Sequence, residues 1–134
     1  MAKMGAPTVS KGIRRVPTQG SDAAPGPART PDPPYWAVIF TSVRNRQPDD
    51  KFDETDEQMM ALAARQPGFL GVETAASDIG ITVSYWADEE SIANWRRNAD
   101  HEFAQYEGRT RWLDAYELRV ARVERAQSFT RVGT

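Results

Sequence analysis

The strongest constraint on this chain is the order of strand-like and helix-like segments after residue 34. Stretches rich in β-branched and aromatic residues predict strands, and apolar residues recurring every three or four positions predict helices. In order, the sequence predicts a strand at 35–46, a helix at 49–68, a hairpin of strands at 69–77 and 81–87, a helix at 88–108, and a last strand from about Tyr116 within 112–129. This β-α-β-β-α-β order predicts an α+β, ferredoxin-like subunit, with both helices on one face of an antiparallel sheet.

The second predicted helix has clear boundary signals. Asp88 is a suitable N-cap, and Gly108 is a natural stop. Residues at helical spacing predict one apolar stripe: Ile92, Trp95, Ala99, Phe103 and Tyr106. A kink near residues 98–100 is an alternative, because Asn and Asp are poor helix formers.

Both faces of the predicted sheet carry apolar side chains. In the first strand Trp36, Val38 and Phe40 point one way, and Ala37, Ile39 and Val43 point the other. Two helices cover only one face, so the second face needs a cover. We therefore predict a homodimer in which the sheets of two copies pack together, with Trp86 and Trp95 meeting different partners. The alternative is that Trp86 and its neighbours are scattered surface aromatics.

Composition distinguishes residues 1–34 from the rest of the chain. Seven of the nine prolines and four of the nine glycines fall in residues 1–34, together with five Lys or Arg and two Asp. Few large apolar residues are available there to offset the entropy of ordering. We interpret 1–34 as a Pro/Gly-rich basic tail, flexible in isolation, 35–129 as the folded domain, and 130–134 as a C-terminal tail. The N-terminal tail is either a solvated leader or expression remnant, or a segment that lies across a neighbouring subunit.

The bulk properties exclude several classes of protein. The formal net charge of -2 gives no basic surface for nucleic acid. No apolar run approaches the roughly 20 residues that span a membrane, and the start of the chain lacks a signal-peptide core. The chain has no cysteine and one histidine, so we predict no metal site and a cytoplasmic location. It contains no nucleophile elbow, phosphate loop or dinucleotide fingerprint.

The second helix carries the candidate chemistry. Four uncharged polar residues step by 4, 3 and 4 positions, so a continuous helix would align Asn94, Asn98, His101 and Gln105. Aromatic walls for a ligand could come from Trp36, Phe40, Trp86, Trp95, Phe103 and Tyr106. Histidine titrates near neutrality, so His101 is the candidate general base. The alternatives are that His101 is a surface hydrogen-bonding residue and that Trp95 belongs only to the core.

Several motifs together resemble the antibiotic-biosynthesis-monooxygenase (ABM) superfamily, in its branch of small stand-alone bacterial proteins. The resemblance covers about residues 35–129 and rests on PPYWAVIF, QPGFLGVETA, ITVSYWADEESIANWRRNADHEFAQ, Trp112 with Tyr116, and LRVARVERA. It implies a dimeric α/β barrel with a pocket between the sheet and the second helix. Characterised branches of this superfamily include cofactor-independent oxygenases of phenolic polyketides, quinol-oxidising enzymes and haem-degrading enzymes, and members without known activity are common.

The haem-degrading branch is disfavoured by two positions. That branch places its axial histidine ten residues after the helix tryptophan, where this chain has Gln105, and a neutral amide is a poor iron ligand. His101 follows Trp95 by only six residues and lies on a different side of the helix. The branch also carries an asparagine on the first strand, whereas residues 38–44 read VIFTSVR.

The sequence thus predicts a cofactor-independent monooxygenase acting on a small aromatic or quinol-like compound. His101 would act as the base, and the other named aromatic and polar side chains would line the pocket. The first alternative is a non-enzymatic protein that binds a small apolar or aromatic ligand or responds to stress. The second alternative is haem binding or haem degradation.

Overall fold

A computed structural model describes residues 13–14, 26–45, 50–102 and 112–132. Its elements are β1 (Ile13–Arg14), β2 (Tyr35–Arg44), α1 (Asp50–Ala64), β3 (Phe69–Ala76), β4 (Gly80–Trp86), α2 (Glu89–Glu102) and β5 (Leu113–Val123). From β2 onward this is the predicted β-α-β-β-α-β order, so the α+β, ferredoxin-like fold is confirmed. The last strand begins three residues before the predicted start at Tyr116.

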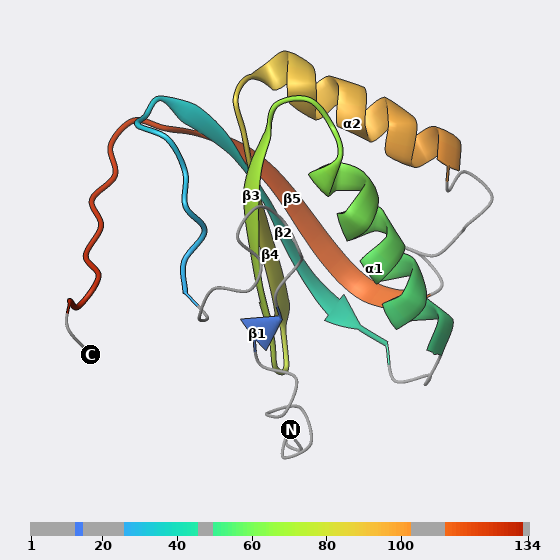
Figure 1. The fold of residues 1–134 in the computed structure, drawn as a ribbon. Helices are drawn as coiled ribbons and strands as arrows, with labels where there is room; N and C mark the ends of the chain where they lie inside the picture. Colours follow the sequence, from blue (N-terminus) through green and yellow to red (C-terminus); the bar gives the residue numbers. More distant parts are fainter. Residues whose placement is uncertain (1–12, 15–25, 46–49, 103–111, 133–134) are drawn as a thin grey trace.

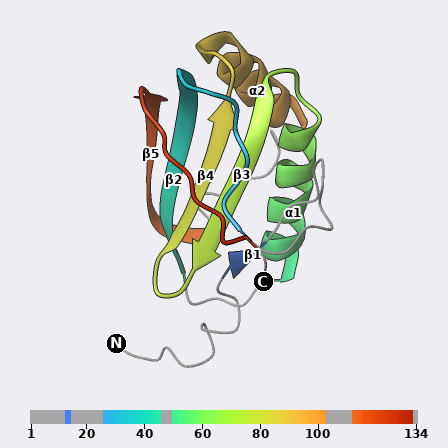
Figure 2. The same ribbon diagram turned by 60° about the vertical axis from the view of Figure 1, so that its left-hand side comes forward.

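The sheet is antiparallel throughout, in the order β1-β3-β4-β2-β5. Both helices lie on one side of it, and two extended segments lie on the other (Figures 1 and 2). The short strand β1, which the sequence did not predict, pairs Ile13 with Ala75 on the outer edge of β3. The other edge of the sheet is β5.

The register of the sheet decides which side chains face the helices. Trp36 lies opposite Trp86 and Val38 lies opposite Ser84, so these four side chains share one face. Trp86 is fully buried on that face, with 0% of its surface exposed. Its ring lies 5.5 Å from the ring of Trp95 on α2. The expectation that Trp86 and Trp95 meet different partners is therefore wrong, because the alternation of β4 turns Trp86 toward α2.

The start of α2 is fixed by a cap and by the loop that follows α1. The Ser91 backbone N–H donates to Asp88 Oδ1 at 2.7 Å, which confirms Asp88 as the N-cap. The Ala87 N–H donates to the Gly68 carbonyl oxygen at 2.8 Å. Within the predicted stripe of α2, Ile92, Trp95 and Ala99 are buried in the core. The predicted members Phe103 and Tyr106 lie outside the described residues, as does Gly108.

The second face of the sheet is partly covered by the chain itself. Residues 26–34, here called the strap, cross this face in front of the strands in Figure 2. The Ala28 N–H donates to Glu73 Oε2 at 2.9 Å, and the Tyr85 hydroxyl donates to Glu73 Oε1 at 2.7 Å. The Thr30 hydroxyl donates to the Tyr35 hydroxyl at 2.9 Å. Residues assigned to the tail by composition are thus bonded to the sheet.

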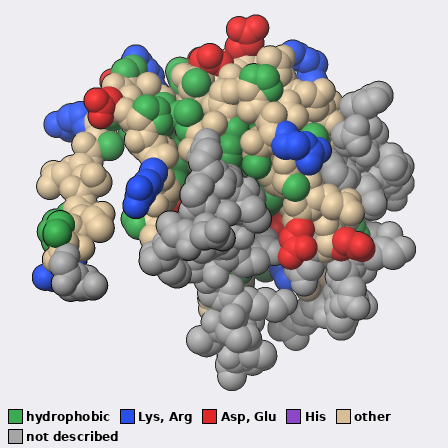
Figure 3. Space-filling view, in the orientation of Figure 1, with side chains coloured by type: hydrophobic (Ala, Val, Ile, Leu, Met, Phe, Trp, Pro, Cys, Tyr) green, Lys and Arg blue, Asp and Glu red, His purple; other side chains and the backbone are tan. Residues whose placement is uncertain are grey.

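Residues 124–132, here called the arm, continue from β5 without regular structure and are exposed along their whole length. The arm stands clear of the rest of the molecule in Figures 1 and 3. It includes the first residues of the predicted C-terminal tail. In the described part of the chain, no helix is long and apolar enough to cross a membrane.

Candidate functional site

An aromatic cluster occupies the space between the sheet and α2. Trp86 lies at its centre, with the ring of Trp95 tilted against it and the ring of Phe69 edge-on at 5.4 Å. The Trp86 indole N–H donates to Ser84 Oγ at 2.9 Å within the same strand. The alternation of β4 explains this bond, because residues two apart on a strand share a face. The polar atom of Trp86 is therefore satisfied inside the core.

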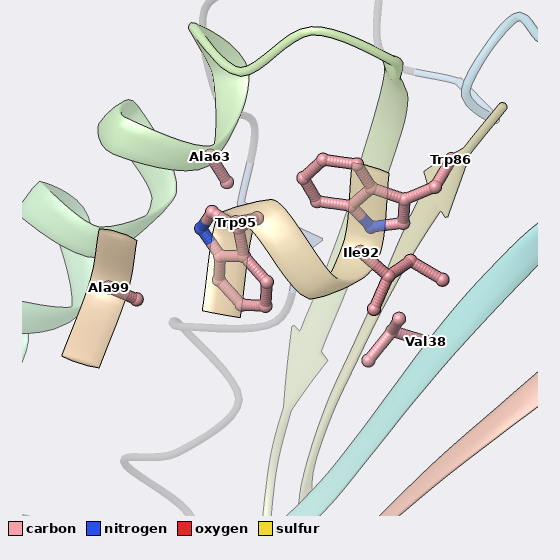
Figure 4. Close-up of a cluster of buried hydrophobic side chains, with 6 residues drawn as sticks. All are labelled: Val38, Ala63, Trp86, Ile92, Trp95 and Ala99. Carbon is pink, nitrogen blue, oxygen red and sulfur yellow. The ribbon is translucent and has the colours of Figure 1, made fainter. Parts of the chain in front are cut away.

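Trp95 differs from Trp86 in one respect that matters for function. Its side chain is only 8% exposed, and its Nε1 atom is buried with no hydrogen-bond partner among the described residues. Figure 4 shows this nitrogen on the side of the ring turned away from Trp86, toward Ala63 and Ala99. An indole N–H can only donate, and a buried donor without an acceptor costs about 1–3 kcal/mol. This donor is available to an acceptor that enters from outside the described residues.

Two further predicted wall residues lie on the same face of the sheet. Trp36 is half-buried and packs against the core cluster. Phe40 is also half-buried, and its ring lies 5.3 Å from the ring of Tyr116 on β5. The structure therefore brings Trp36, Trp86 and Trp95 together and places Phe40 farther along the same face.

Asn94 and Asn98, the first two members of the predicted polar row, are hydrogen-bonded to other side chains near the surface. Asn98 is exposed, and its Nδ2 donates to Gln66 Oε1 at 2.8 Å, which ties α2 to the end of α1. The Asn94 side-chain oxygen accepts from the Arg97 guanidinium, one turn along α2. Neither contact involves the aromatic cluster.

The remaining predicted residues fall at the end of the described part of α2. His101 belongs to the last turn of the helix, but its side chain lies outside the described residues. Phe103 and Gln105 lie outside them entirely. Their roles as base, wall and polar lining, and the comparison of Gln105 with the haem-degrading branch, stay predictions.

A pair of threonines on the same face was not singled out by the sequence. The hydroxyl groups of Thr74 and Thr82 are 2.8 Å apart, across β3 and β4. Their register, together with that of Phe40, places them on the helix-facing side. Isolated threonines in strands give no signal in the sequence, because the pairing appears only once the register is known.

Titratable groups with shifted pKa values lie away from the aromatic cluster. Burial, followed by the hydrogen bond to Glu73, raises the pKa of Tyr85 on the second face of the sheet. The Ser91 backbone N–H lowers the pKa of the Asp88 carboxyl at the helix cap. Among the described residues, no group of three or more His, Asp or Glu side chains could hold a metal ion. The chemistry offered by the described part of the cluster is aromatic contact and one hydrogen-bond donor.

Comparison with solved structures defines the class of fold. PA3566 from Pseudomonas aeruginosa superposes with a TM-score of 0.55 and 12% identity, over 71% of this chain and 97% of that one. NE2512 from Nitrosomonas europaea, a protein of unknown function, superposes with a TM-score of 0.55 and 11% identity, over 72% and 96% of the two chains. At these identities the likeness is one of fold.

Comparison with known sequences defines the family. No family model matches the chain. The uncharacterised protein YqjZ of Bacillus subtilis is 48% identical over 104 residues, covering 76% of this chain and 90% of YqjZ. The chain therefore belongs to the same family as YqjZ.

A more distant relative carries a functional name. The jasmonate monooxygenase ABM of Pyricularia oryzae is 29% identical over 94 residues, covering 69% of this chain. The match spans only 39% of the length of the fungal protein. This distant similarity agrees with the resemblance of the motifs to the ABM superfamily.

Proposed function

We propose that this protein is a cofactor-independent monooxygenase of a small aromatic or quinol-like compound, and that the Trp95 indole N–H anchors the substrate. The observation that carries the proposal is the buried Nε1 atom of Trp95, for which the part of the chain that the structure describes supplies no hydrogen-bond acceptor. Buried polar groups in proteins are almost always hydrogen-bonded, so an unpaired donor beside aromatic rings indicates a missing acceptor. A flat molecule with one acceptor oxygen would satisfy it.

The chemistry of the surroundings narrows the class of ligand. Trp95 is 8% exposed, and the described side chains around it are mainly apolar. A ligand with an aromatic ring would contact the edge of the Trp95 ring, while its oxygen accepted the Trp95 N–H. A phenolate oxygen accepts a stronger hydrogen bond than a neutral phenol does, so this donor would favour the deprotonated form.

Deprotonation is also what prepares a phenol for reaction with dioxygen. The phenolate donates electrons to O₂, one oxygen atom bonds to the ring carbon, and the other leaves as water. For a simple phenol the balance is C₆H₆O + O₂ → C₆H₄O₂ + H₂O, and the substrate supplies all the electrons. The protein would hold the substrate, remove its proton and stabilise the negative charge.

We propose His101 as the base that accepts the phenolic proton. Histidine is the side chain whose ordinary pKa lies nearest neutrality, and this is the one histidine of the chain. Helix α2 carries both His101 and Trp95, so a single element would position the base and the anchor. The name of the fungal relative, jasmonate monooxygenase ABM, supports oxygenation as the class of reaction.

The test is oxygen uptake by the purified protein with a panel of phenols and hydroquinones. Trp95→Phe keeps a ring but removes the N–H group, and we expect it to lower kcat/KM by roughly tenfold to a hundredfold, the value of a hydrogen bond to a charged acceptor. His101→Ala should abolish turnover. The matched control is Trp112→Phe, since Trp112 is also buried but lies beside β5, outside the cluster.

Each result separates the proposal from its alternatives. Equal uptake by Trp95→Phe and the unchanged protein would remove Trp95 as the anchor. No uptake with any substrate, together with ligand binding that Trp95→Phe weakens, would show the non-enzymatic binding protein instead, because the same buried donor would serve that function. A Soret band on haem titration that disappears in His101→Ala would show haem binding.

A further inference from the structure

We propose that the hydrogen bond between Gln66 and Asn98 is a gate, which must open before a ligand oxygen reaches the Trp95 N–H. The inference rests on the proposed function for the class of ligand, a phenol or hydroquinone, whereas the gate itself can be tested without turnover. Three features support the gate: the direction of the Trp95 N–H, the small side chains in front of it, and a side-chain bridge between the two helices beside it.

The Trp95 N–H points away from the strands, to the line along which α1 and α2 meet, here called the seam. In Figure 4 the nitrogen lies on the side of the ring that faces Ala63 of α1 and Ala99 of α2. Both alanines are buried. Their methyl groups shield the donor but cannot accept its hydrogen bond. An acceptor oxygen therefore reaches this donor where the two helices part at the seam.

A side-chain bridge crosses the seam one turn beyond these residues. Asn98 Nδ2 donates to Gln66 Oε1 at 2.8 Å, and Gln66 Nε2 donates to the Leu62 carbonyl oxygen at 3.3 Å. Asn98 follows Trp95 by three residues, so the two are neighbours on the surface of α2. The Gln66 backbone N–H donates to the Ala63 carbonyl oxygen at 3.0 Å, which keeps Gln66 beside the same end of α1. The bridge thus lies next to the buried donor, on its solvent side, since Asn98 is exposed.

The bridge is of a kind that opens without unfolding the core. Its two partners are uncharged amides near the surface, and water competes for both of them, so the bond stabilises the closed seam only modestly. Local opening at such a place requires far less free energy than global unfolding. The Trp86 N–H is different, because it donates to Ser84 Oγ on the strand and becomes free only when the core itself opens. The gate therefore controls access to Trp95 and not to Trp86.

Deuterium exchange of the indole N–H groups, followed by NMR, measures the opening, because each tryptophan gives its own signal. In Asn98→Ala and in Gln66→Ala of the full chain, we expect the Trp95 N–H to exchange about fivefold faster, the effect of losing one neutral hydrogen bond. The double variant should exchange no faster than the faster single variant, because both substitutions break the same bond.

Two controls separate the gate from general loosening of the fold. Asn94→Ala is the matched variant, since the Asn94 side chain is bonded to Arg97 within α2 and does not link α2 to α1. It should leave the exchange of the Trp95 N–H unchanged. The Trp86 N–H is the internal reference, and its exchange should be the same in every variant.

The path of the ligand is tested with phenol as the probe. Stopped-flow tryptophan fluorescence would give its association rate, which we expect to rise about fivefold in Asn98→Ala if the closed seam is what delays entry. An association rate that Asn98→Ala leaves unchanged would show that phenol takes another path, and would overturn the gate.

Two results of the exchange experiment would also overturn the gate. One is equal exchange of the Trp95 N–H in the unchanged protein and in Asn98→Ala. The other is equal acceleration of the Trp86 and Trp95 signals, which would show that the bridge only stabilises the fold. The outcome is distinguishable from failure of the proposed function. Faster exchange of Trp95 without phenol binding or oxygen uptake would keep the gate and remove the function, whereas uptake that depends on Trp95 with unchanged exchange would do the reverse.

Discussion

Gly68 holds the end of α1 close to the start of α2, and its replacement should be costly for two separable reasons. Its φ angle is +86°, a conformation that residues with side chains rarely adopt. A Cβ atom at this position would lie 2.0 Å from Ser91 Oγ and 2.5 Å from Ser91 Cβ. Because Ser91 belongs to the first turn of α2, any shift that relieves the clash would move the helix that carries Trp95.

The two contributions to Gly68→Ala can be given magnitudes. A left-handed backbone costs a non-glycine residue about 1–2 kcal/mol. Carbon atoms in contact normally lie about 3.5–4.0 Å apart, so the new methyl group and Ser91 must separate by roughly 1 Å, at an overpacking cost of about 1–3 kcal/mol. The lower entropy of the unfolded alanine chain offsets about 0.4–1 kcal/mol. The expected net loss of unfolding free energy is about 1–5 kcal/mol.

Urea denaturation, followed by tryptophan fluorescence, would measure this loss in a double-mutant cycle with Ser91→Gly. Ser91→Gly alone should cost about 0.5 kcal/mol through lower helix propensity. In the Ser91→Gly protein, Gly68→Ala should cost only the backbone contribution of about 1–2 kcal/mol, because the clashing Ser91 side-chain atoms are absent. An equal cost in both backgrounds would refute the steric part of the reasoning. No cost in either would refute the need for a left-handed residue at position 68.

Two further predictions concern pH. Above pH 10.0, the usual pKa of tyrosine, an unfolded chain releases the Tyr85 proton while the folded protein, with its raised pKa, retains it, so stability falls as pH rises. In Tyr85→Phe, the urea midpoint of unfolding should therefore fall less steeply as pH rises above this value. The lowered pKa of Asp88 stabilises the fold above pH 3.8, and this stabilisation is lost as pH falls below that value. Asp88→Asn keeps a capping side chain and should flatten that acid limb; an unchanged slope would contradict the cap assignment.

The order of elements could be predicted from the sequence because each element carries its own local signals. The stripe at Ile92, Trp95 and Ala99 and the cap at Asp88 needed only neighbouring residues. The place of Trp86 was not predictable in the same way. Alternation showed that Trp86 and Tyr85 point to opposite faces, but only the packed sheet shows which of those faces the helices cover.

The attachment of the strap to the sheet could not be predicted from the sequence for a different reason. Its composition is that of a flexible segment, and its attachment depends on Glu73, which lies 45 residues after Ala28 in the chain. Hydrogen bonds between such distant positions leave no periodic pattern. In the same way, the aromatic residues of the site could be named from the sequence, whereas the unpartnered state of the Trp95 N–H depends on packing.

The close approach of Ala28 and Gly71 limits the size of the side chain at both positions. A Cβ atom at Gly71 would lie 3.1 Å from the Ala28 Cβ, so the two positions share one small volume. A larger side chain at either position would lift the strap away from β3 and lengthen the Ala28–Glu73 hydrogen bond. In related chains that keep the strap, the sizes of these two residues should therefore vary together. Such covariation would reveal the attachment of the strap from sequences alone.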